Sequence, residues 1–213
     1  MIWILRILNF ILLGFAFWSL FFKPELTRIV FIIIGFLFLI SGLRKALIIG
    51  LDNLRGRFWV LLSLNGLIFP LASLLNSDVL HLISRFYLFI TLLFMFSGLR
   101  RQGLSLVKMK AMLWLLLVAT VIILSFLFSL IIENKNFLTY LYLFVLNMNF
   151  AILLANVLMY LGSDLGKRWF IGFLAFAFFF IGDPLYLINF KELAHFFFCF
   201  IFFFINIVAH IEE

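Results

Sequence analysis

Long apolar runs, each about the length that crosses a bilayer as a helix, fill this chain and decide what it can fold into. Eight such runs are separated by short polar segments, and we place helices at 2–22, 29–50, 58–76, 79–99, 111–132, 137–162, 169–189 and 193–210. Isolated strands of this length would leave their backbone groups unpaired in lipid. The chain is therefore expected to be an all-α integral membrane protein, with eight transmembrane helices in a single domain over residues 1–213.

The composition excludes most other classes of protein. Hydrophobic residues make up 67% of the 213 residues, charged residues make up 12%, and the mean hydropathy is +1.30. In soluble domains about a quarter of the residues carry charge. The loops left between eight helices are too short for a nucleotide-binding fold, a kinase or a DNA-reading module. We expect a multi-pass protein of a bacterial inner membrane or an equivalent cell membrane.

The basic residues predict the orientation of the helices. Lys and Arg lie mostly in short loops beside apolar runs, so the net charge of +7 is interpreted as a topology signal and no nucleic-acid partner is expected. Eleven of them fall on one side of the eight helices, and the other side holds five: Lys23, Arg28, Arg85, Lys135 and Lys191. Because the more basic side faces the cytoplasm, both termini are expected there.

Two acidic residues are candidates for chemistry, since polar groups inside apolar runs are costly and tend to be functional. Asp183 lies between Gly182 and Pro184, residues that loosen a helix and free backbone groups to line a cavity. Asp78 lies on the same, outer half of the membrane, where the run 58–76 gives way to the run 79–99. The alternatives are a structural hydrogen bond for Asp183 and simple loop solvation for Asp78.

Helical spacing arranges other polar residues on shared faces. In the last run His195, Cys199 and Asn206 share one face, and His195 lies at a depth that could meet Asp183. His81 follows Asp78 by three residues, which would put both on one face if a helix begins there.

A further stripe lies in the run 137–162, where Tyr142, Asn149 and Asn156 recur every seven residues. These three side chains either line a polar cavity or hold helices together by hydrogen bonds.

Motifs of other membrane enzymes are absent from the sequence. It holds no Gly-x-Ser-x-Gly, no His-Glu-x-x-His and no phosphate loop, which argues against the usual intramembrane serine and zinc proteases. A metal site built from Asp78, His81, Asp183 and His195 is chemically possible, but nothing in the spacing demands one. We expect neither a metal nor a cofactor.

Two segments carry a resemblance to a known family. Tyr142, Met148 and the segment GFLAFAFFFIGDPLYLINF at 172–190, with Gly182, Asp183, Asn189 and Phe190 at its motif positions, resemble the C-terminal half of the YhhN-like lysoplasmalogenase family. The segment LASLLNSDVLHLISRF at 71–86 resembles, more loosely, an earlier motif of that family, with Asp78 as its acid. Two positions depart from the pattern, since Pro184 follows the acid and Ser77 replaces the usual Gly.

The resemblance implies hydrolysis of the vinyl ether bond of a lysoplasmalogen, and thus a membrane lipid or lysophospholipid as partner. Protonation of the enol ether carbon gives an oxocarbenium ion, which water attacks. We expect Asp183, the deeper acid, to donate the proton and Asp78 to orient the water. Substrate-binding roles are expected for His195, Tyr142, Asn149 and His81. The competing interpretation is a protein without enzymatic activity, either a small transporter or a membrane anchor or sensory module.

Overall fold

A computed structural model describes residues 2–101, 130, 136–161, 171, 175 and 178–211, and every regular element within them is a helix. The helices are α1 (Ile2–Phe22), α2 (Glu25–Ile49), α3 (Leu54–Leu74), α4 (Asp78–Arg101), α6 (Phe137–Leu161), α8 (Phe179–Leu187) and α9 (Lys191–Ile211). All of these except α8 are long and apolar enough to cross a membrane, which makes six candidate spans in the described part.

The prediction of an all-helical, multi-pass membrane protein is confirmed in this form. The predicted helix at 111–132 lies outside the described residues, and of the predicted helix at 169–189 the structure describes only residues 171, 175 and 178–189. Eight spans therefore stay a prediction. Several of the described helices begin a few residues before the apolar runs do, where polar residues form the first turn. Asn53, for example, accepts a hydrogen bond from the backbone N of Arg55 at 3.0 Å and starts α3.

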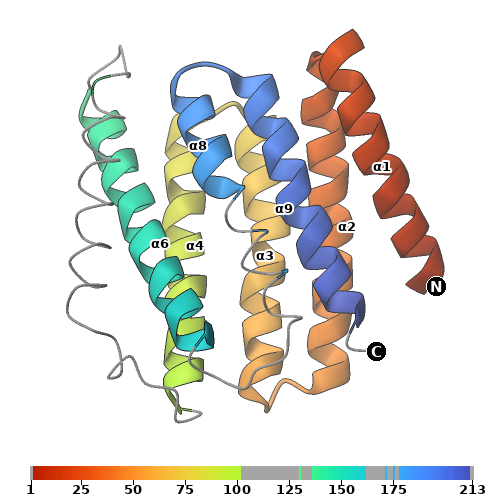
Figure 1. Cartoon of the computed structure of the whole chain (residues 1–213), viewed down its shortest axis with the longest axis vertical. Coiled ribbons are helices and arrows are strands. Elements are labelled where there is room, and N and C mark those ends of the chain that lie inside the picture. The colour runs from red at the N-terminus through yellow and green to blue at the C-terminus, as the bar shows by residue number, and fades with distance from the viewer. Residues whose placement is uncertain are drawn as a thin grey trace.

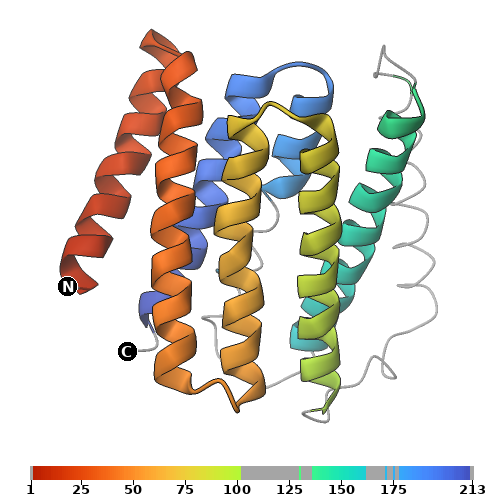
Figure 2. The ribbon, with the colours of Figure 1, turned by 180° about the vertical axis from the view of Figure 1, so that it is seen from behind.

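The helices form a bundle in which most sequence neighbours are antiparallel and in contact (Figure 1). The turns α1–α2, α3–α4 and α8–α9 lie together at the end that is uppermost in Figure 1, which we call the upper end. The start of α1 and the end of α9 both lie toward the opposite, lower end, as the view from behind also shows (Figure 2). Asn9 marks this pairing, since its side-chain amide donates to the carbonyl oxygen of Phe203 at 3.3 Å.

Helices α4 and α6 are parallel, unlike the hairpin pairs. Asn149 donates to the carbonyl oxygen of Arg85 at 3.0 Å, and Asn156 donates to that of Leu92 at 3.1 Å, with the same sequence separation of 64 residues. Because both hydrogen bonds join residues 64 positions apart, α4 and α6 run in the same direction, and the bonds fix their register. The chain thus leaves α4 at the lower end and enters α6 at the upper end (Figure 1).

The surface of the bundle is unusually apolar for a soluble protein. Large apolar side chains point outward along the helices, with Trp3 and Phe22 of α1 exposed by 72% and 70% and Phe137 by 81%. Charged and amide side chains such as Arg85 and Asp183 are meanwhile fully buried. A soluble protein rarely exposes apolar patches of this extent, so this surface fits lipid.

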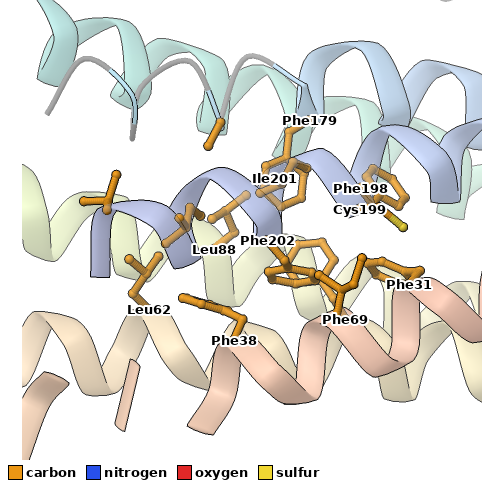
Figure 3. Packing of buried hydrophobic residues seen from close by; sticks show 14 of the residues in the cluster. Phe31, Phe38, Leu62, Phe69, Leu88, Phe179, Phe198, Cys199, Ile201 and Phe202 are labelled. Atoms are coloured by element: carbon orange, nitrogen blue, oxygen red, sulfur yellow. The ribbon is translucent and has the colours of Figure 1, made fainter. Parts of the chain in front are cut away.

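Aromatic side chains from several helices fill the interior. Figure 3 shows Phe31 and Phe38 of α2, Phe69 of α3 and Phe202 of α9 packed around one another. The ring of Phe202 stacks on those of Phe31 and Phe38, with centroid distances of 5.6 and 5.3 Å. This cluster ties α2, α3 and α9 into the rigid side of the bundle.

Glycines let α2 and α3 approach each other very closely. A Cβ atom added at Gly66 would lie 2.5 Å from the carbonyl oxygen of Gly35 and 2.9 Å from the ring of Phe38. Small residues at such crossings are typical of membrane helices, because close packing replaces the hydrophobic driving force that lipid does not supply.

We expect Gly66→Ala to lower the thermal unfolding temperature of the purified protein, because the new methyl group must push backbone against backbone. Overpacking of this kind costs about 1–3 kcal/mol. Gly14→Ala is the matched control, since nothing lies within 4 Å of a Cβ at Gly14, and it should be neutral or stabilising. Equal effects of the two changes would show that the α2–α3 contact is looser than described.

Candidate functional site

Two tight turns shape the upper end of the bundle. Asn76 in the α3–α4 turn and Asn189 in the α8–α9 turn have φ values of 47° and 65°, in the left-handed region that Asn tolerates better than most residues. The Nζ of Lys191 donates to Oδ1 of Asn76 at 3.2 Å and so joins the two turns. This link holds the starts of α4 and α9 beside each other.

Below these turns lies a buried ion pair between Arg85 of α4 and Asp183 of α8. Nε of Arg85 lies 2.8 and 2.7 Å from the two carboxylate oxygens of Asp183, and Nη2 donates to Oδ1 as well. The side chains are 0% and 1% exposed. Nη1 of Arg85 donates to the hydroxyl of Ser84 at 3.0 Å. The two opposite charges therefore compensate each other inside the bundle.

Aromatic rings surround the guanidinium group of Arg85. Its Cζ lies 4.2 Å from the ring centroid of Phe69, 5.1 Å from Phe198, 5.4 Å from Phe179 and 5.7 Å from Tyr142. A cation over an aromatic face is stabilised by about 2 kcal/mol or more when it is desolvated. The rings thus supply part of the solvation that water would give to the charge.

Gly182 leaves room for the ring of Phe198. A Cβ atom at Gly182 would collide with the ring of Phe198, so only glycine lets α8 lie this close to α9. The Gly182–Asp183–Pro184 segment that stands out in the sequence is part of a continuous helix, and α8 runs through it to Leu187. The close approach of α8 and α9, and not a break in the helix, is what the glycine provides.

Arg85 does not lie at the outer surface, where the count of basic residues places it. Its side chain is fully buried and paired with Asp183. A long cationic side chain near a helix end can reach either the headgroups or the interior, and the acid on α8 draws this one inward. Lys45, counted on the more basic side, is buried as well, so without these two residues the count becomes ten against four and keeps its direction.

Tyr142 connects the ion pair to the upper end. Its hydroxyl donates to Oδ1 of Asp183 at 3.2 Å, and the residue also lines a pocket between α4, α6 and α8. Asn149 and Asn156, on the same stripe of α6, instead bind carbonyl oxygens of α4. The stripe therefore does both things that its spacing suggests: two members hold helices together and the third borders a cavity.

That cavity, the upper pocket, has a volume of about 140 Å³. Its lining is polar and consists of Asp78, Asn136, Leu138, Thr139, Tyr142, Tyr186, Leu187, Asn189 and Lys191. Asp78, the first residue of α4, is exposed here, whereas Asp183 lies behind the wall that Tyr142 forms. Tyr142 thus lines the same pocket as Asp78 and is also hydrogen-bonded to Asp183.

Two histidines lie buried next to the upper pocket. His81 packs against the ring of Tyr186 at a centroid distance of 4.2 Å, and neither of its ring nitrogens has a partner in the described structure. Nε2 of His195 lies 3.0 Å from the hydroxyl oxygen of Ser73. His195 contacts Ser73 and forms no hydrogen bond with Asp183, which its depth in the last run suggests as a partner. Helix α4 does begin at Asp78, three residues before His81, although Asp78 is exposed and His81 is buried.

Cys199 and Asn206, the other two members of the α9 stripe, are also buried, but neither is hydrogen-bonded to Asp183 in the described structure. His195, Cys199 and Asn206 are all buried, as their shared helix face predicts. Asn206 contacts Asn9 at 3.4 Å near the lower end. Among the described residues no three His, Cys, Asp or Glu side chains gather closely enough to hold a metal ion.

Comparison of the chain with protein-family models, curated proteins and solved structures finds no match. Its function must therefore be argued from the site itself.

We expect Asp183→Asn to destabilise the protein by about 3–5 kcal/mol, because it leaves the guanidinium of Arg85 buried without a countercharge. Arg85→Gln should cost a similar amount by stranding the carboxylate. The double variant Arg85→Gln/Asp183→Asn places two neutral amides face to face and should recover at least half of the loss. Unfolding free energies in detergent form the double-mutant cycle, and purely additive losses would contradict the ion pair.

Proposed function

We propose that this protein is a membrane hydrolase of the lysoplasmalogenase type, which cleaves the vinyl ether bond of a lysophospholipid in the upper pocket. One observation carries the proposal. Asp78 lines the pocket, and Tyr142, which lines it too, is hydrogen-bonded to Asp183. Of the two acids that the family resemblance marks, Asp78 therefore borders the polar pocket directly, and Asp183 is linked to it through the hydroxyl of Tyr142.

The position of the pocket suits a lipid substrate. It lies beside the tight turns at the upper end, where the spans end and a lysophospholipid would present its glycerol backbone. Lys191 lines it and supplies positive charge for a phosphate. The apolar chain of the lipid can remain among the exposed apolar side chains of the spans. The reactive ether bond would then lie at the boundary between polar and apolar surroundings.

Formation of the hemiacetal needs two proton transfers, which balance, and its later breakdown moves the proton of its hydroxyl to the leaving glycerol oxygen. A proton added to the β-carbon of the enol ether leaves an oxocarbenium ion. Water adds to its C1 carbon and loses a proton, which gives a hemiacetal. The hemiacetal then breaks its C–O bond to release a fatty aldehyde and the hydroxyl of the glycerophospho head group. One carboxyl group can serve both transfers, as acid and then as base.

Asp78 is the residue to which we assign both transfers. The sequence suggests Asp183 as the proton donor, but its two oxygens accept hydrogen bonds from Arg85, which is always protonated, and this arrangement favours the ionised carboxylate. Asp78 is exposed at the pocket, in reach of water and substrate. Asp183 then acts through Tyr142, whose hydroxyl it holds in place at the inner wall.

We expect Asp78→Asn to reduce hydrolysis of a lysoplasmalogen at least a hundredfold, since removal of a general acid–base typically costs about 10²–10⁴ in rate. The unfolding temperature should stay unchanged, because Asp78 is exposed. Release of the fatty aldehyde by the purified chain measures the activity, with Asp52→Asn, an exposed acid away from the pocket, as control. The proposal fails if the unaltered protein releases no aldehyde or if Asp78→Asn remains fully active.

A second candidate is a membrane protein without enzymatic activity, such as a transporter, an anchor or a sensory module. The observation that favours it is the closure of the Arg85–Asp183 pair, whose side chains are 0% and 1% exposed. Together with the bonds from Asn149 and Asn156 to α4, the pair would then serve only to assemble helices. Under this alternative Asp78→Asn is silent, while a transporter moves its substrate across sealed vesicles without changing it.

A further inference from the structure

A second pocket lies at the upper end, between the start of α2, the α3–α4 turn and the start of α9. Its volume is about 370 Å³, and its lining consists of Glu25, Arg28, Ile29, Asn76, Lys191, Glu192 and His195. Lys191 lines the upper pocket as well and so lies between the two cavities. The upper pocket lies toward α6 and the second pocket lies toward α2.

Two acids and two bases line this second pocket without pairing with one another. In the described part of the chain Arg28, Glu25 and Glu192 form no ion pair, and Lys191 binds the amide oxygen of Asn76. A ligand that carries both a positive and a negative charge would find partners for both in this pocket. Helices α2 and α9 also begin here, and the positive ends of their dipoles favour a phosphate.

His195 adds a polar group that points to a ligand. It is 3% exposed and lines the pocket, its Nε2 lies 3.0 Å from the hydroxyl oxygen of Ser73, and its Nδ1 has no partner in the described structure. If Ser73 donates to Nε2, the neutral ring carries its proton on Nδ1 and can donate it. A buried donor without an acceptor is costly, so an acceptor oxygen in the pocket would be bound favourably.

An apolar stripe on α2 starts at the pocket. Ile29 lines it, and Ile33, Phe36 and Ile40 follow on the same exposed face, with exposed fractions between 39% and 55%. The spacing of four, three and four residues keeps these side chains in line along the helix. A molecule whose charged end occupies the pocket could lay its acyl chains along this stripe.

We propose that the second pocket binds the headgroup of a phosphatidylethanolamine lipid. Arg28 and Lys191 bind the phosphate beside the ring of His195, and the carboxylates of Glu25 and Glu192 bind the primary ammonium group. The lining contains no Phe, Tyr or Trp, which are the residues that recognise the quaternary ammonium of choline. The two pockets share Lys191, but the second pocket would hold the lipid whether or not the upper pocket cleaves one.

The affinity of the purified full chain for short-chain lipids in mild detergent tests this assignment. We expect phosphatidylethanolamine to bind at least tenfold more tightly than phosphatidylcholine or phosphatidylglycerol of the same chain length, and free phosphoethanolamine to bind much more weakly. Equal affinity for the three lipids overturns the headgroup assignment. Free phosphoethanolamine binding as tightly as the lipid overturns the lipid as occupant.

Variants locate the site. Arg28→Gln and Glu192→Gln should each weaken phosphatidylethanolamine binding about tenfold, the loss expected for one charge-assisted contact. Lys23→Gln removes a charge at the same end but outside the pocket lining and should leave the affinity unchanged. Glu192 and Lys23 are exposed, so their replacement should leave the unfolding temperature without lipid unchanged, and for the half-buried Arg28 this temperature is measured alongside the affinity. Equal losses for Lys23→Gln and Arg28→Gln, or no loss for Arg28→Gln, contradict the proposal.

Discussion

The buried ion pair between Arg85 and Asp183 is the interaction on which the upper half of this bundle depends. A charge inside a membrane is costly unless a partner compensates it, and here the compensation is nearly complete. The pair joins α4 to α8, Tyr142 brings in α6, and the ring of Phe198 brings in α9. A single electrostatic contact thus sets how four helices lie against one another around the upper pocket.

The rest of the scaffold relies on close packing and not on charge. Glycines at the α2–α3 crossing and stacked aromatic rings between α2, α3 and α9 hold these three helices together (Figure 3). Both pockets lie at the upper end, one between α4, α6 and α8 and the other between the starts of α2 and α9.

The sequence alone predicts the class of the fold, because apolar runs of bilayer length leave helices as the only choice. It also identifies Asp183, Asp78 and the stripe of Tyr142, Asn149 and Asn156, since polar residues in such runs are few. The partner of Asp183 is not predicted. Arg85 falls seven residues inside its helix, and a count of charges cannot show whether a long side chain turns to the headgroups or to the interior.

Other parts of the site depend on tertiary contacts that leave no local signal. Ser73 contacts His195 across 122 residues, and Lys191 reaches Asn76 across 115. The left-handed turns at Asn76 and Asn189 bring these residues together, but an Asn at the end of an apolar run does not by itself reveal that geometry. An arginine within a span, matched in depth by an acid on another helix, is the one signal that could have led to the ion pair from the sequence.

The ionisation state of Asp183 tests the account most directly, because both the architecture and the assignment of proton transfer to Asp78 rest on it. The infrared difference spectrum between the unaltered protein and Asp183→Asn reports that state. The account predicts the loss of ionised carboxylate bands at neutral pH. Loss of the carbonyl band of a protonated carboxylic acid would contradict it.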